Sequence, residues 1–175
     1  MSANLQLVED FINTRSIELG SDDIADRAAL AGWLRERKLL PPGTTVTPAG
    51  HRRAVRLREG LRALAVVHNE AGPDRRAEAD VADLARELPL VVDLSGPAPR
   101  LAPRSSSPAD AALATILAAV AESAAEGTWA RFKACRDDNC HWAYLDESRN
   151  RSRAWCSMAS CGNRAKARAF RNRAS

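Results

Sequence analysis

Apolar residues recur three and four positions apart over most of the first 125 residues, which is the pattern of amphipathic α-helices. The pattern predicts five helices, which begin near Leu5, Ile24, Thr47, Asp74 and Ser107. Their apolar stripes are Leu5, Val8, Phe11 and Ile12; Ile24, Ala28, Ala31 and Leu34; Ala54, Leu57, Leu61, Leu64 and Ala65; Val81, Leu84, Ala85 and Leu88; and Leu113, Ile116, Leu117 and Val120. We therefore expect a mainly helical body.

Capping residues and chain breaks divide these helices. Ser21-Asp22-Asp23 is typical of an N-cap and is expected to open the second helix. Thr47-Pro48 and Ser107-Pro108 place a capping side chain directly before a proline, which is favoured in the first turn of a helix. The segment KLLPPGTT, residues 38–45, and the pair Gly72-Pro73 break the helical pattern.

The pattern changes after the fourth helix. Leu90–Leu94 is a short run with β-branched residues, Ser95-Gly96 is typical of a turn, and Arg100–Ala102 is a second extended segment. Prolines at 97, 99 and 103 confine the second strand to a sheet edge, because proline donates no backbone hydrogen bond. The predicted fold class is α+β, with a mainly helical N-terminal domain at residues 1–126, which includes this small β-hairpin, and a second domain at residues 127–175.

The overall composition is that of an ordinary globular chain, with 45% hydrophobic and 27% charged residues. The sequence contains no run of 18 apolar residues, so we expect no membrane-spanning helix. The first residues, MSANLQLVEDFINTRS, lack the basic segment and apolar run of a signal peptide. We expect a cytoplasmic protein with no membrane partner.

Charge is distributed unevenly along the chain. Residues 127–175 contain 11 Lys and Arg against 4 Asp and Glu, a balance of +7, whereas residues 1–126 contain 15 against 18, a balance of −3. A basic segment attached to a slightly acidic body is typical of proteins that bind polyanions, above all nucleic acid, although a solvated basic tail has the same balance. All four cysteines and six of the eight aromatic residues lie in the basic segment, which favours a small folded unit.

The four cysteines, Cys135, Cys140, Cys156 and Cys161, follow the pattern C-x4-C-x15-C-x4-C. Two short pairs of cysteines separated by such a loop predict a structural zinc ion with four thiolate ligands. A closed shell of this kind leaves no position for a catalytic water. Metal binding would also supply folding free energy that so small a unit lacks. Two disulfides or an iron–sulfur cluster are the alternatives, and His141 is expected beside the site rather than in it.

The segment CGNRAKARAFRNR predicts a basic helix that begins at or near Cys161. Arg164, Arg168 and Arg171 share one stripe of this helix, Lys166 and Arg173 form a second, and Phe170 is expected to anchor it on the zinc core. Such a helix could be held against the phosphate backbone of DNA or enter the major groove, or it could be a basic terminal helix that packs nearby. The candidate DNA contacts are Arg149, Arg151, Arg153, Asn163, Arg164, Lys166, Arg168, Arg171 and Arg173.

Residues Tyr144–Arg173 resemble the CGNR zinc-finger family in the Asp146–Asn150 run DESRN, in the sequence WCSM and in the Cys161–Arg164 tetrad CGNR. The resemblance covers about residues 135–173 and implies a treble-clef-like finger, with a zinc knuckle, a hairpin and a C-terminal helix that carries the last ligand. In that family the finger follows a domain called ABATE, which is considered a stress-induced transcription regulator. Glu9–Arg15, EDFINTR, is similar to the opening of that domain.

These patterns favour a DNA-binding transcriptional regulator whose N-terminal domain senses a signal or forms a homodimer. Asn13 and Arg15 are candidates for a small-molecule effector, although a role in bridging the two domains is the preferred interpretation. The alternative function is a zinc-stabilised protein-interaction or dimerisation module without direct DNA binding. A variant places nucleic acid on the arginine-rich helix at residues 47–69. No catalytic motif stands out, so we expect no enzyme.

Overall fold

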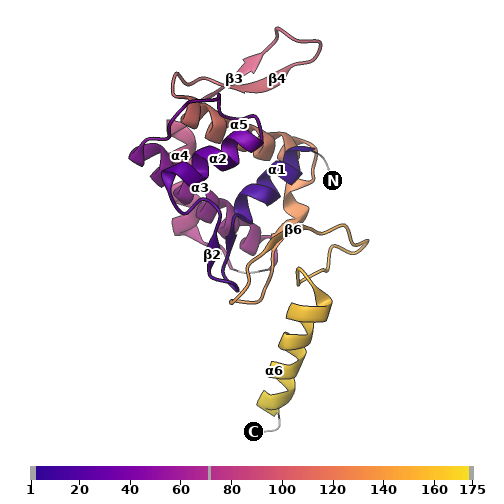
Figure 1. Ribbon diagram of the computed structural model, residues 1–175. Coiled ribbons are helices and arrows are strands. Elements are labelled where there is room, and N and C mark those ends of the chain that lie inside the picture. Colours follow the sequence, from indigo (N-terminus) through magenta and orange to yellow (C-terminus); the bar gives the residue numbers. More distant parts are fainter. Residues whose placement is uncertain (1–2, 71, 174–175) are drawn as a thin grey trace.

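The computed structural model describes residues 3–70 and 72–173, which form a helical body with three two-stranded antiparallel sheets (Figure 1). The elements are α1 (Ala3–Ile12), β1 (Arg15–Ser16), β2 (Ser21–Asp22), α2 (Arg27–Glu36), α3 (Pro48–Val67), α4 (Arg75–Glu87), β3 (Leu90–Asp93), β4 (Arg100–Pro103), α5 (Pro108–Ala125), a short 3-10 helix (Trp129–Arg131), β5 (Phe132–Ala134), β6 (Ala143–Leu145), a π-helix (Met158–Gly162) and α6 (Asn163–Arg173). The α+β class and the five body helices are confirmed.

The caps of α3 and α5 agree with the sequence prediction. The Thr47 hydroxyl accepts a hydrogen bond from the Gly50 N–H at 3.0 Å, and the Ser107 hydroxyl accepts one from the Asp110 N–H at 3.4 Å. A proline follows each cap and occupies the first turn. Both helices therefore begin where the sequence places them.

The predicted cap of α2 was wrong. Asp26 caps this helix and accepts hydrogen bonds from two backbone N–H groups at 2.8 Å each, whereas Ser21–Asp22 forms β2. The Asp22 carboxylate binds the guanidinium of Arg58 at 2.6 Å and accepts a hydrogen bond from the Ile24 N–H at 3.0 Å, so it stabilises the turn after β2 rather than the start of α2. The end of α3 also differs from the prediction, because the helix stops at Val67 rather than at Gly72-Pro73.

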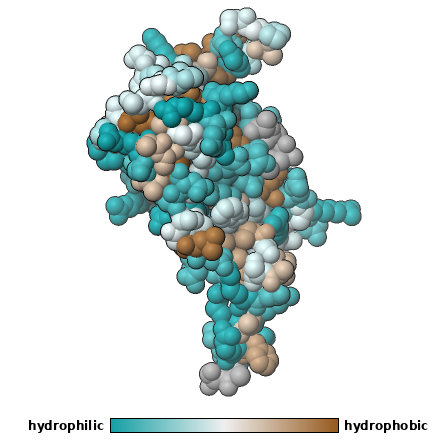
Figure 2. Space-filling view, viewed as in Figure 1, coloured by the Kyte–Doolittle hydropathy of each residue, from teal (hydrophilic) through white to brown (hydrophobic). Residues whose placement is uncertain are grey.

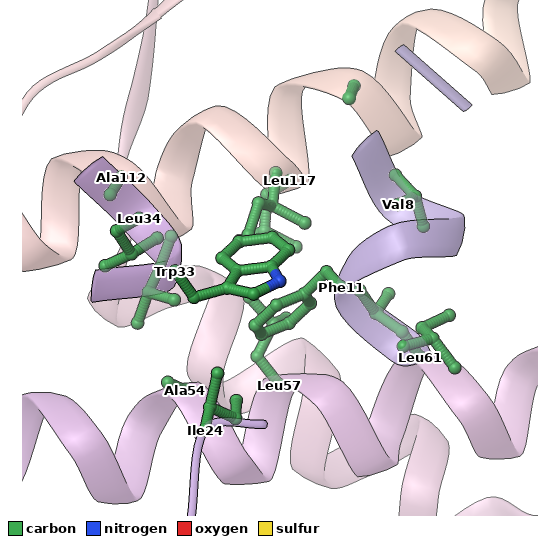
Figure 3. Close-up of a cluster of buried hydrophobic side chains, with 14 of the residues drawn as sticks. Val8, Phe11, Ile24, Trp33, Leu34, Ala54, Leu57, Leu61, Ala112 and Leu117 are labelled. Carbon is green, nitrogen blue, oxygen red and sulfur yellow. The ribbon is translucent and has the colours of Figure 1, made fainter. Parts of the chain in front are cut away.

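The core of the body lies between α1, α2, α3 and α5 (Figure 3). Phe11 of α1 packs on Trp33 of α2 with ring centroids 5.6 Å apart, and Leu57 and Leu61 of α3 are fully buried beside them. Helix α5 is the one described helix long and apolar enough to cross a membrane, yet nine of its residues are buried in the protein. It therefore serves as a core helix.

The hairpin predicted after α4 is confirmed. Strands β3 and β4 pair from Leu90 opposite Pro103 to Asp93 opposite Arg100, and they project from the end of the body opposite to α6 (Figure 1). Strand β4 packs on α5, while Val92 of β3 is exposed.

The hairpin β5–β6, which carries the first two cysteines, is packed into the same core. Phe132, Ala134 and Ala143 are fully buried and belong to the hydrophobic cluster of the body. Gly127, at φ +71°, forms the turn that leads from α5 towards this hairpin, a conformation that glycine adopts without strain. The basic segment thus begins as part of the body, and only α6 extends away from it (Figure 1).

Candidate metal centre and basic arm

Four cysteine thiols converge beside the β5–β6 hairpin. Cys135 directly follows β5 and Cys140 lies in the turn before β6, while Cys156 lies in the loop before the π-helix and Cys161 within it. The four sulfur atoms lie within 4.8 Å of one another, and all but the half-buried Cys156 are buried. The sequence spacing therefore brings both pairs together as predicted.

The sulfur positions fit a tetrahedral zinc ion. Zinc binds thiolates at about 2.3 Å, so two ligands of a tetrahedral site lie about 3.8 Å apart. The Cys140–Cys156 and Cys156–Cys161 sulfur atoms are 3.6 and 3.7 Å apart. These distances exceed the bond of about 2.0 Å in a disulfide, and they leave no room for a cluster of several irons. The site is therefore a closed, structural zinc centre.

Hydrogen bonds stabilise the negative charge that such a centre carries. The backbone N–H groups of Asp137 and Cys156 donate hydrogen bonds to the Cys135 sulfur and favour its thiolate form. The guanidinium of Arg164 lies 3.1 Å from the Cys161 sulfur. Four thiolates and one zinc ion sum to −2, so these donors offset charge where it accumulates.

Asp137 joins the knuckle between the first two cysteines to the start of α6. Its carboxylate is 1% exposed and accepts a hydrogen bond from the Arg164 Nε at 3.0 Å, with the Arg168 guanidinium at 3.4 Å. Its backbone carbonyl accepts from the N–H of Cys140 at 2.7 Å. Burial would raise the pKa of Asp137, but the hydrogen bond from Arg164 and its neighbours lower it. A single residue thus shapes the knuckle and holds α6.

The glycine of the CGNR tetrad allows close packing at the π-helix. A Cβ atom at Gly162 would lie 2.7 Å from the Met158 sulfur and 3.3 Å from the Trp155 ring. The nearest atoms belong to the flexible end of Met158, which is 52% exposed, so a larger residue at position 162 would have to displace this side chain.

The C-terminal end of α3 holds the cysteine module on the body. The Asn69 amide donates hydrogen bonds to the carbonyls of Ala134 and Ala154 at 2.8 and 2.9 Å, and it is 3% exposed. The Arg62 guanidinium donates to the His141 carbonyl at 3.0 Å. His141 contributes no ligand to the cysteine cluster, in agreement with the prediction. Asn69 and Arg62 could not be assigned this role from the sequence, because their partners lie far along the chain.

Comparison with known families agrees with this arrangement. A family model described as "CGNR zinc finger" matches residues 131–174. The ABATE model, described as "Putative stress-induced transcription regulator", matches residues 5–127, which is more than half of the chain. The chain belongs to the ABATE family. A search of curated proteins gives no match.

The finger that follows the ABATE domain contains one hairpin, β5–β6, and this hairpin itself carries the zinc knuckle. The described residues between β6 and the π-helix, 146–157, form no strand. A C-terminal helix follows the last cysteine, as the resemblance implies. The predicted treble-clef topology stays a prediction.

Four of the candidate DNA contacts are engaged within the protein, one of them Arg168 through its contact with Asp137. Arg164 binds Asp137 and Glu18, and the Asn163 amide donates to the Ala159 carbonyl. Arg153 donates to the carbonyl of Trp155 and lies over the Tyr144 ring, 4.4 Å from its centroid. These side chains stabilise the finger itself.

The other candidates are exposed. Helix α6, which we call the basic arm (Asn163–Arg173), has no buried residue and is mainly hydrophilic in the surface view (Figure 2). These candidates are Arg149 and Arg151 in the preceding loop, and Lys166, Arg171 and Arg173 on the arm. The expected anchoring by Phe170 was wrong: this side chain is 69% exposed, because the arm projects beyond the zinc core.

The two candidates for effector binding lie at the junction of the ABATE domain and the finger. The Asn13 side chain exchanges two hydrogen bonds with the Ala143 backbone of β6, at 2.8 and 2.9 Å. Arg15 lies 3.7 Å from the Glu59 carboxylate. Asn13 thus bridges the ABATE domain and the finger, which is the interpretation preferred from the sequence. It bonds to the edge of β6 that does not pair with β5.

A buried ion pair in the finger was not expected from the sequence. Lys133 of β5 and Asp146 lie 2.7 Å apart, and their side chains are 7% and 0% exposed. Burial would raise the pKa of Asp146, but hydrogen bonds from Lys133 and Ser148 outweigh it and lower the pKa to about 2. Lys133 also donates to the Arg151 carbonyl at 2.6 Å, so the pair folds the DESRN segment onto β5. In the sequence, the DESRN segment was noted, but its ion pair with Lys133 was not predicted.

Proposed function

We propose that the chain is a DNA-binding transcriptional regulator whose zinc centre presents the basic arm to the phosphate backbone. The observation that carries this proposal is the arm itself. It projects from the finger, has its main contacts with the π-helix, and directs the cationic side chains of Lys166 and Arg173 into solvent (Figure 1). A helix of 11 residues is only marginally stable alone in water. A helix that is attached at one end and exposed along the rest of its length is therefore suited to binding a partner that stabilises it.

The charge of the finger matches a polyanion. Zinc and its thiolates lower the balance of residues 127–175 from +7 to +5, so the attraction persists after metal binding. Lys166 and Arg173 are exposed on the arm, and Arg149 and Arg151 lie in the loop before the third cysteine. If about five side chains each contact a phosphate, log K should fall against log salt with a slope of about −4.5.

Binding of the zinc-loaded protein to duplex genomic fragments tests the proposal. We expect Lys166→Glu/Arg173→Glu to raise the Kd about tenfold or more and to make the salt slope shallower by about 2. The matched control is Arg52→Glu/Arg75→Glu, which makes the same charge change at two exposed positions of α3 and α4. Equal losses in the two variants, or no DNA binding by the wild-type protein, would refute the proposal.

An exposed apolar group beside the zinc centre supports a second candidate function, a protein-interaction module. Leu19, Trp142 and Met158 are 81%, 38% and 52% exposed, and the first two line a shallow cavity of about 390 Å³ with three of the cysteines. A protein partner would cover this group, and its binding would change little with salt. Binding that is insensitive to salt, without affinity for DNA, would select this function.

We propose no catalytic activity, since the two matched families are a regulator and a zinc finger. The division at residue 126, cytoplasmic localisation, a role in the stress response, a small-molecule effector and a homodimer stay predictions from the sequence.

A further inference from the structure

The arginine of the CGNR tetrad connects the arm to the ABATE domain. Its guanidinium donates to both carboxylate oxygens of Glu18, at 2.6 and 3.3 Å, across a separation of 146 residues. Glu18 lies in the turn between β1 and β2. Arg164 also donates to Asp137 at 3.0 Å and to the Cys161 sulfur at 3.1 Å. All three nitrogens of the guanidinium are therefore engaged within the chain.

The turn that carries Glu18 is itself held by a buried side chain. Arg58 of α3, at 1% exposure, donates to both carboxylate oxygens of Asp22 on β2 at 2.6 and 2.8 Å. It also donates to the Thr14 hydroxyl at 3.1 Å, directly before β1. Arg58 thus holds both strands next to the turn, and this turn carries Glu18 to the first turn of the arm.

We propose that Glu18 is a positioning residue that, through Arg164, fixes the direction of the basic arm relative to the ABATE domain. Its consequence for DNA affinity rests on the proposed function, but its effect on the arm does not.

The leverage of this contact follows from the geometry of the helix. Arg173 lies nine residues beyond Arg164, which is about 13.5 Å further along the axis. A tilt of roughly 10° at the first turn would displace that end by roughly 2 Å, enough to break hydrogen bonds to a phosphate. Without Glu18, the guanidinium would keep its contacts with Asp137 and the Cys161 sulfur, which belong to the finger, but would lose its contact with the ABATE domain, so the arm should sample more directions relative to that domain.

Fluorine NMR of the zinc-loaded full chain tests the proposal without DNA. The chain has three phenylalanines, so 4-fluorophenylalanine gives three resonances. Phe170 reports on the arm, whereas Phe11 and Phe132 are fully buried in the body and serve as internal references. We expect Glu18→Ala to lower the transverse relaxation rate of the Phe170 resonance about twofold and to leave the other two unchanged.

The matched control is Glu126→Ala, which removes the same charge from an exposed position after α5. A Phe170 relaxation rate that is the same in wild type, Glu18→Ala and Glu126→Ala, with one zinc per chain in each, would overturn the proposal. This outcome is independent of whether the protein binds DNA.

DNA binding then separates positioning from direct contact. If Glu18 positions the arm, Glu18→Ala raises the Kd about threefold relative to Glu126→Ala, because a looser arm loses more conformational entropy on binding, and the salt slope stays unchanged. A lower Kd with a slope steeper by about 1 would mean that Arg164 is released to bind phosphate, which would also overturn the proposal. Absence of DNA binding by the wild type would refute the proposed function and leave the relaxation result as the test.

Discussion

Helices α3 and α6 are both rich in arginine, yet their arginines have opposite surroundings. Four of the five arginines of α3 face acidic partners: Arg53 with Asp110 at 2.7 Å, Arg56 with Glu87 at 4.0 Å, Arg58 with Asp22 at 2.6 Å and Arg62 with Glu59 at 3.0 Å. On α6, Arg164 and Arg168 contact the Asp137 carboxylate, whereas Lys166 and Arg173 extend into solvent. The hypothesis of a nucleic-acid surface on α3 is therefore not favoured, since its charge is largely neutralised within the protein.

The difference arises from the position of each helix in the fold. Helix α3 contacts α1, α2, α4, α5 and β5, so two of its arginines, Arg58 and Arg62, are buried, where an unpaired charge would be costly. Helix α6 has its main contacts with the π-helix that presents Cys161. The same residue type is thus structural in one helix and available to a ligand in the other.

Removal of zinc is expected to have the largest effect, and to affect α6 far more than α3. A structural zinc site contributes on the order of 10 kcal/mol to the folding of a small module. We expect Cys161→Ser to abolish stoichiometric zinc, to reduce helical signal from the arm and to weaken DNA binding about 100-fold or more. Elemental analysis, circular dichroism and anisotropy measure these effects.

The paired arginines of α3 should persist in that variant, so the near-ultraviolet signal of Trp33 in the body core is expected to remain. Readdition of zinc to chelator-treated wild-type protein provides the control. Full DNA affinity in a zinc-free protein would contradict the idea that the metal mounts the arm.

Substitution of a buried arginine of α3, in contrast, should cause a large loss of stability of the body. Arg62 is 3% exposed and donates to the carbonyls of Ile12 and His141 as well as to Glu59. Arg62→Met leaves these acceptors unpaired, and we expect it to lower the free energy of unfolding by about 3–5 kcal/mol. Denaturant unfolding of the zinc-loaded protein measures the change.

Arg52 provides the matched control, since it is exposed on the same helix. Arg52→Met should change stability by less than about 0.5 kcal/mol, although it removes the same charge. Similar losses in the two variants would mean that the surroundings of the α3 arginines do not determine their role.

Local features of the fold could be predicted from the sequence, whereas contacts between distant segments could not. The caps Thr47 and Ser107 and the cysteine spacing depend on a few adjacent residues, so the sequence indicates them directly. The pairing of Arg164 with Glu18 joins residues 146 positions apart. The CGNR tetrad distinguishes Arg164 from Lys166, but nothing near Arg164 in the sequence indicates that Glu18 is its partner. Phe170 was misassigned because an apolar residue on a helix is usually buried, but no element covers the arm.

The smallest of these effects concerns Lys133, a buried cation in the same module as the arm. Lys133 belongs to the basic segment but is buried. If burial makes a cation structural, removal of its partner Asp146 should lower the stability of the fold. The pKa of Asp146 is about 2 in the folded chain and about 3.9 when unfolded, so its ionised form stabilises the fold at every pH above about 4. We expect Asp146→Asn to cost about 2–3 kcal/mol.

Because the pKa of Asp146 is lowered on folding, its contribution is lost only as the pH falls from about 4 towards 2. The cost of Asp146→Asn should therefore be constant between pH 5 and 8, where urea unfolding of the zinc-loaded protein can be measured. Asp138→Asn is the control, because that side chain is 99% exposed and should change stability little. A cost that shrinks from pH 8 to pH 5 would show that Asp146 is not held ionised by Lys133, and the distinction between buried and exposed cations would then fail within the finger itself.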